Sequence, residues 1–160
     1  MIHKIVAVGK LREKHWQDAA SDYTRRLRPY ARMETVEVAE ARIPENASPA
    51  EERKAMDQEA ATILEKLKRH SGPVVVLDRQ GRSLDSKELA AWLEARLLEG
   101  QGETAWVIGG PLGLAPPVLQ RADLVLSFSR MTFPHQLMRI ILLEQIFRSF
   151  RIMHHEPYHK

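Results

Sequence analysis

Three segments of the sequence place glycine or polar residues directly after an apolar, strand-like run. They are 77–81 (Leu-Asp-Arg-Gln-Gly), 108–113 (Ile-Gly-Gly-Pro-Leu-Gly) and 128–135 (Phe-Ser-Arg-Met-Thr-Phe-Pro-His). In open α/β sheets, ligands bind at the carboxyl ends of the strands, and glycines there let a ligand approach the backbone closely. These segments therefore predict a site that suits an adenine or a ribose, although a lone Gly-Gly-Pro is also typical of a tight turn.

The glycines do not follow the pattern of a phosphate-binding loop. A dinucleotide fingerprint would follow the first strand, whereas the first apolar run here leads into Gly9-Lys10-Leu11-Arg12. The sequence also has no Gly-Lys-Ser or Gly-Lys-Thr, the signature of nucleoside-triphosphate sites. Dinucleotide and nucleoside-triphosphate chemistry are therefore disfavoured.

The sequence offers no recognisable metal site. It contains no cysteine, which excludes disulfides, thiolate zinc sites and cysteine nucleophiles and permits a reducing cytosol. The tail, 154–160, is rich in histidine, but adjacent histidines point in different directions in most backbones and no carboxylate completes a ligand set. We expect no metal.

The elements that must position these segments alternate between strand-like and helix-like patterns. Apolar or alternating runs predict strands at 5–8, 35–38, 74–77, 105–108 and 124–128. Helical spacing predicts helices at 16–27, from Ser48 or Pro49 to about 70, from a cap at Ser86 to about 97, briefly after Pro117, and at 136–150. This alternation indicates an α/β fold with a mostly parallel sheet and helices on both faces.

Length and hydropathy indicate one domain in solution. The 160 residues fit a single domain, and the longest strongly apolar run, 140–143, is far too short to span a membrane. The first residues lack a signal-peptide pattern, so we expect a cytoplasmic protein. The last helix is apolar on most of its circumference and normally such a helix is buried, which suggests homodimerisation through 137–150.

The net charge of +3 is unevenly distributed along the chain. Residues 1–32 carry +5, residues 33–66 carry −5, residues 67–120 are neutral, and residues 121–160 carry +3. If the two basic ends meet in the fold or across a dimer, they would form a positive face suited to a polyanion. Ordinary fluctuation of surface charge explains the same pattern equally well.

Five separated motifs occur in the order found in one known family. They are Val6-Ala7-Val8-Gly9-Lys10-Leu11, Leu77-Asp78 with Gly81, Ile108-Gly109-Gly110-Pro111 with Gly113, Leu126-Ser127-Phe128-Ser129 continuing through Met131-Thr132-Phe133-Pro134-His135-Gln136 to Arg139, and Pro157-Tyr158-His159-Lys160. Together they resemble the ribosomal RNA large subunit methyltransferase H family over the whole of 1–160.

The resemblance implies a single-domain SPOUT α/β fold, with a C-terminal trefoil knot and a cofactor-binding region at about 74–160. It implies a homodimer that transfers methyl from S-adenosylmethionine to N3 of a pseudouridine in 23S rRNA. The target stem-loop faces the decoding centre of the assembled ribosome. The family's cofactor positions fall here on Leu77, Gly109, Phe128, Ser129, Arg130, Met131, Thr132 and Phe133. Met131 and Phe133 would form apolar walls, although core packing explains them as well.

The resemblance also suggests candidates for handling the substrate base and the RNA, namely His135, Arg139, Tyr158 and His159. The positive end of the last helix favours a neutral His135 that accepts a proton. Arg139, one turn later, is suited to a phosphate or a deprotonated base. Helix capping by His135 and a surface ion pair of Arg139 are the alternative interpretations.

The tail is an active-site segment if the resemblance holds, and a disordered end otherwise. Tyr158 is suited to stacking on a base. Deletion of 157–160 is expected to abolish methylation and leave the fold intact.

Two other functions fit the same residues. A non-catalytic ribosome-binding module would use the basic ends without binding S-adenosylmethionine. A knotted methyltransferase acting on tRNA would keep the chemistry and change the substrate.

Overall fold

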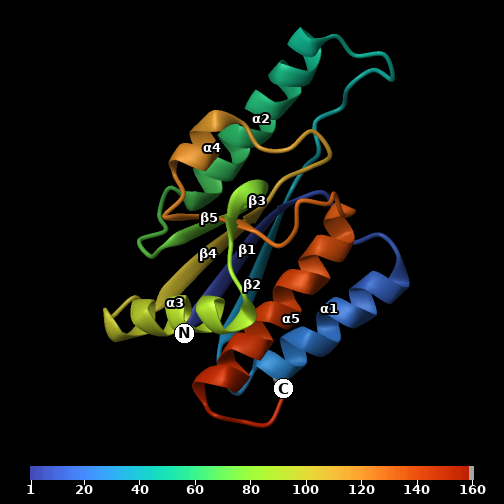
Figure 1. Ribbon diagram of the computed structural model, residues 1–160. Helices are drawn as coiled ribbons and strands as arrows, with labels where there is room; N and C mark the ends of the chain where they lie inside the picture. The colour runs from blue at the N-terminus through green and yellow to red at the C-terminus, as the bar shows by residue number, and fades with distance from the viewer. Residues whose placement is uncertain (159–160) are drawn as a thin grey trace.

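The computed structural model describes residues 1–158, and its five strands form one parallel sheet in the order β2-β1-β4-β3-β5 (Figure 1). The strands are β1 (Ile2–Val8), β2 (Arg32–Val38), β3 (Val74–Ser83), β4 (Glu103–Ile108) and β5 (Leu124–Ser127). All neighbouring strands are parallel, because a helix between each two successive strands returns the chain to the same edge. The predicted α/β fold is confirmed.

Helices cover both faces of the sheet, as the alternation predicted (Figure 1). They are α1 (Lys14–Leu27), α2 (Pro49–Leu67), α3 (Ser86–Leu98), α4 (Pro116–Gln120) and α5 (His135–Met153). One apolar core joins α1, α3 and α5 to one side of the strands, and a second joins α2 and α4 to the other. Because both faces are covered, the central strands are apolar without alternation.

The predicted start of α2 is confirmed, whereas the predicted cap of α3 is not. α2 begins at Pro49 as predicted, and Ser48 caps it through a capping box with Glu51. The cap of α3 is Asp85, whose carboxylate accepts a hydrogen bond from the Glu88 amide, and Ser86 is the first residue of the helix. The prediction of Ser86 as the cap is wrong, because the preceding residue, Asp85, has the extended backbone of a cap and its carboxylate accepts from the Glu88 amide.

β3 is longer than its apolar run. The sequence predicts a strand at 74–77 and a loop after it, but the strand continues to Ser83 with a shifted register against β5. Gly81 permits this close passage, since an ideal Cβ there would lie 2.7 Å from the carbonyl carbon of Val125. The trefoil knot implied for about 74–160 stays a prediction.

α5 buries much of its apolar surface within its own chain. It contacts α1 and α3, and Leu142, Ile146 and Phe150 lie in the core. Leu143 and Phe147 are buried as well, and the other apolar side chains of α5 are half-buried, so homodimerisation stays a prediction. Among the described helices, none has the length and hydropathy that crossing a bilayer requires.

Candidate active site

A cleft of about 550 Å³ opens at the carboxyl ends of three neighbouring strands, β4, β3 and β5. It is lined by residues within β3, by residues at and after the ends of β4 and β5, and by the start of α5, namely 77–79, 108–114, Leu126, 128–129, 131–135 and Met138. The three segments singled out by their glycines and polar residues therefore meet at one place. A volume of this size suits a small-molecule ligand.

The glycines in the second segment keep this cleft open. An ideal Cβ on Gly109 would lie 2.7 Å from the Cγ of Leu114, closer than side-chain carbons approach. Gly113 has a φ of +86°, a conformation that glycine adopts without strain. Together they let the chain fold back after β4 and leave backbone facing the cleft.

The predicted cofactor residues line the cleft with one exception. Leu77, Gly109, Phe128, Ser129, Met131, Thr132 and Phe133 all belong to its lining. Met131 is 73% exposed, so core packing does not explain it. Arg130 is exposed and lies outside the lining, beside Arg79 and Gln80 in a separate hollow.

His135 stands where α5 begins, and its ring packs against the loop after β1. The helix cap is Pro134 and no side chain makes a capping hydrogen bond there, so the capping interpretation of His135 is wrong. An ideal Cβ on Gly9 would lie 2.9 Å from the Nε2 of His135, and Gly9 has a φ of +87°. The glycine therefore makes room for an imidazole that lines the cleft.

Arg139 holds the same loop from behind His135. Its side chain is 3% exposed, and its two terminal nitrogens donate hydrogen bonds to the Glu37 carboxylate (2.8 Å) and to the Gly9 carbonyl (3.0 Å). Glu37 also accepts from the Leu11 amide at 3.4 Å. Arg139 does form an ion pair, with Glu37, but the arginine side chain is buried and not on the surface as expected. Both terminal nitrogens of Arg139 are therefore bonded inside the chain.

Tyr158 lies away from the cleft in this chain. Its hydroxyl donates to Glu144 at 3.2 Å and its ring packs edge-on against Phe147, with the Arg148 guanidinium 4.8 Å from the ring centre. Burial raises the pKa of Tyr158 to about 12. Phe147 is three turns along α5 from His135, roughly 18 Å at 1.5 Å per residue. His159 lies outside the described residues.

Two carboxylates that support the site do not stand out in the sequence. Glu37 lies on an alternating strand, where a polar residue is expected. Glu59 is more informative, because it shares one face of α2 with Met56 and Ile63 and is only 5% exposed. It accepts a hydrogen bond from the Ala41 amide at 2.9 Å, and its Oε2 would lie 3.4 Å from a Cβ on Gly110. Burial raises the pKa of Glu59.

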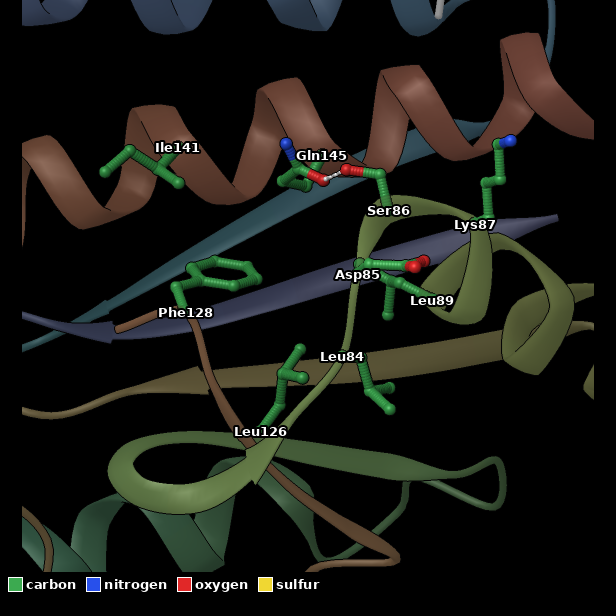
Figure 2. A pocket seen from close by; sticks show the side chains of 9 residues that line it. All are labelled: Leu84, Asp85, Ser86, Lys87, Leu89, Leu126, Phe128, Ile141 and Gln145. Atoms are coloured by element: carbon green, nitrogen blue, oxygen red, sulfur yellow. Dashed lines mark hydrogen bonds between the residues drawn. The ribbon is translucent and has the colours of Figure 1, made fainter. Parts of the chain in front are cut away.

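A second cavity of about 510 Å³ lies between the start of α3 and α5 and shares Leu126 and Phe128 with the cleft (Figure 2). Figure 2 shows Ser86 reaching across to Gln145, to which its hydroxyl donates at 2.8 Å. Asp85 is occupied by the capping of α3. Because these polar groups hold the two helices, the first cleft is the better candidate for a ligand.

Known proteins resemble this chain along its whole length. A family model described as "Predicted SPOUT methyltransferase" matches residues 1–159. The ribosomal RNA large subunit methyltransferase H of Carboxydothermus hydrogenoformans is 49% identical over 156 residues, which is 98% of each chain. This chain belongs to the ribosomal RNA large subunit methyltransferase H family. The resemblance seen in the five motifs is confirmed.

Two solved structures share the fold of this chain. A probable methylase family protein from Haemophilus influenzae Rd KW20 has a TM-score of 0.55 at 14% identity, over 99% of this chain and 70% of that one. A probable methyltransferase from Bordetella pertussis Tohama I has a TM-score of 0.56 at 16% identity, over 92% and 95%. At such identities the likeness concerns the fold alone. In this methyltransferase H family member, three of the five motifs contribute residues to the cleft.

Proposed function

We propose that this protein transfers a methyl group from S-adenosylmethionine to N3 of a pseudouridine in 23S rRNA, in the stem-loop that faces the decoding centre of the assembled ribosome. The observation that carries the proposal is the cleft, because residues from three strand ends predicted to bind this cofactor line one cavity. The name of the 49% identical relative supports ribosomal RNA as the substrate.

The residues of the cleft suit S-adenosylmethionine. Leu77, Met131 and Phe133 provide apolar surface for an adenine, and the glycine backbone at 109–110 allows close approach. The Asp78 carboxylate also lines the cleft and is the type of group that accepts hydrogen bonds from ribose hydroxyls. When bound, the cofactor supplies a methyl group on a sulfonium sulfur.

Methyl transfer asks the protein chiefly to orient its two substrates and exclude water. The walls formed by Phe128, Met131 and Phe133 are suited to excluding water from the reacting atoms. N3 of the base loses a proton when it gains a methyl group. His135 lines the cleft at the start of α5, so its imidazole is the group we assign to accept that proton.

Arg139 and Glu37 contribute indirectly. Their bonds to Gly9 and Leu11 fix the loop against which the His135 ring packs. A fixed imidazole matters because displacement of a catalytic group by about 1 Å costs on the order of 100-fold in rate. We therefore assign both residues to positioning and neither to contact with the base.

The decisive experiment uses ribosomes that carry the pseudouridine and ribosomes from a strain that lacks it. We expect labelled methyl to be incorporated only into the first, with N3-methylpseudouridine found after digestion of the 23S rRNA. Incorporation into neither ribosomes nor free 23S rRNA would refute the proposed activity.

The other two functions give different results. A non-catalytic ribosome-binding module would show no heat of binding with S-adenosylmethionine in calorimetry, and would still bind ribosomes. A tRNA methyltransferase would bind the cofactor and label tRNA in preference to ribosomes.

We also propose that the protein is a cytoplasmic homodimer, with half-buried apolar side chains of α5 at the interface. Leu137, Ile140 and Ile141 are three such residues. Light scattering at micromolar concentration is expected to give twice the mass of 18.4 kDa. A monomer at that concentration would contradict the proposal.

The tail is proposed to handle the RNA. A contact between Tyr158 and the cleft of the same chain would require the tail to leave Glu144, so the deletion of 157–160 tests the tail as a whole. We expect that variant to lose methylation and keep its circular dichroism spectrum. Wild-type turnover from it would remove the tail from the site.

A further inference from the structure

An open hollow of about 450 Å³ lies beside the cleft and has no part in the function proposed above. It is lined by Arg79, Gln80 and Arg130. Arg79 belongs to β3 and Arg130 to the segment between β5 and α5, so the fold brings together two cations that are far apart in sequence. Arg79 also lines the cleft, which makes the two cavities neighbours.

The charge of this arginine hollow is not balanced by the chain itself. Neither Arg79 nor Arg130 takes part in an ion pair within residues 1–158. The carboxylate next in sequence, Asp78, accepts a hydrogen bond from the Gln80 amide at 2.8 Å and lines the cleft instead. Two cations that face one hollow repel each other, and a bound anion removes that repulsion.

Arg79 is exposed, and hydrogen bonds orient its side chain and its backbone. Its guanidinium donates to the Thr132 hydroxyl at 3.2 Å, and its carbonyl accepts from the Ser127 hydroxyl at 3.1 Å. An arginine that is already oriented loses less conformational entropy when it binds. The hollow therefore has two exposed cations, of which Arg79 is oriented by its hydrogen bond to Thr132.

We propose that the arginine hollow binds a backbone phosphate of the RNA strand, next to the nucleotide whose base enters the cleft. Arginine forks match the oxygens of a phosphate well. S-adenosylmethionine carries no phosphate, so its single carboxylate is the alternative anion that the hollow could bind. Because Arg130 lies outside the cleft lining, the geometry favours the RNA over the cofactor. This inference rests on the proposed function, since it takes RNA as the substrate.

The test measures how the affinity of the full-length protein for 70S ribosomes depends on salt. Each phosphate contact contributes roughly 0.7 to 0.9 to the slope of log K against log salt concentration. We expect Arg79→Ala/Arg130→Ala to lower that slope by about 1 and to weaken binding by about ten-fold near 0.1 M salt. The Arg79→Lys/Arg130→Lys variant keeps both charges and should keep most of the slope.

The matched control removes two exposed cations elsewhere. Arg53 and Lys54 lie together on the exposed side of α2, so Arg53→Ala/Lys54→Ala changes the net charge equally. We expect its slope to stay at the wild-type value. An equal fall in both double-alanine variants would show general attraction only and would overturn the inference.

Calorimetry with S-adenosylmethionine separates the two anions. If Arg79→Ala/Arg130→Ala weakens cofactor binding and leaves the ribosome slope unchanged, the hollow holds the carboxylate of the cofactor and the inference is wrong. Failure of the proposed function appears differently, as absence of methyl incorporation by the wild-type protein. The salt slope is measured without turnover, so the two results are independent.

Discussion

Toward the amino-terminal ends of the parallel strands, the buried side chains of His3 and Trp106 bond to each other, whereas the carboxyl-terminal ends carry partly exposed glycines and exposed apolar side chains. At the first end, the Trp106 indole donates to the Nδ1 of His3 at 2.9 Å, and both side chains are fully buried. At the second end, Met131 is 73% exposed beside the glycines of the cleft.

The two ends illustrate different uses of the same sheet. Polar groups bonded inside the chain contribute to stability, because leaving one of them unbonded in the core is costly. Side chains turned toward solvent contribute little to the fold and remain available to a ligand. Substitutions at the carboxyl end should therefore reduce activity, and substitutions at the amino end should reduce stability.

The largest effect is expected from Gly109→Ala at the carboxyl end. The added methyl group would overlap Leu114, so either the cleft wall or the chain must shift. We expect methyl transfer to fall by about 100-fold, the usual consequence of a misplacement near 1 Å. Radiolabelled methyl incorporation into ribosomes measures this.

Gly102→Ala is the matched control for that change. Nothing lies within 4 Å of an ideal Cβ on Gly102, so its activity should remain at the wild-type level. Equal activity of the two variants would contradict the role given to Gly109.

The next largest loss of activity is expected from Arg139→Ala, because Arg139 bonds the loop that contacts His135. Arg139→Ala removes the bonds to Glu37 and Gly9. Without these bonds the loop against which His135 packs is no longer fixed, so we expect kcat to fall by about ten-fold or more, as for other small displacements of a catalytic group. Single-turnover methylation is the measurement.

A conservative substitution separates positioning from a general loss of stability. Glu37→Gln keeps an acceptor for Arg139 and for the Leu11 amide, so it should retain more activity than Glu37→Ala. If the two Glu37 variants are equally impaired, and by as much as their melting temperatures fall, the residue serves the fold alone.

At the amino end, Trp106→Phe should reduce stability and leave turnover at 25 °C unchanged. The variant leaves the Nδ1 of His3 without its donor in the core, at a cost of about 1 to 3 kcal/mol. Calorimetric unfolding should show a melting temperature several degrees lower. Trp92→Phe is the control, because Trp92 lies on α3 and is half-exposed. Its melting temperature should change little.

The smallest effect is a pH dependence of stability that arises from His3. Burial, and then the charge of the N-terminal amine, lower the pKa of His3 to about 3, against 6.5 in an unfolded chain. Between these values the unfolded state binds the extra proton, so stability falls as pH falls. From pH 6.5 to 5.5 we expect a loss of about 1 kcal/mol.

Urea unfolding across that interval checks the prediction. His3→Gln keeps an acceptor for Trp106 and does not titrate, so its midpoint should vary less with pH. An equal pH dependence in both proteins would assign the effect to other groups.

Local patterns in the sequence predicted most of the elements and the lining of the cleft. Apolar runs identify buried strands, and the glycine-rich or polar segments just past them mark the edge where a ligand binds. The family resemblance then pointed to Leu77, Gly109 and Met131 within these segments. Positions that depend on partners from distant elements were not found in this way. Arg139 looks like a surface residue until Glu37 and Gly9 are placed beside it.

The sequence by itself determined the α/β class, the family and the three segments that form the cleft, because these depend on periodicity and on motifs written along the chain. Tertiary structure alone decided which charges are paired. It buried Arg139 against Glu37, left Arg79 and Arg130 facing one hollow, and placed Tyr158 against Glu144. Pairing depends on which elements pack together, and contacts between residues a hundred positions apart leave no periodic trace in a single sequence.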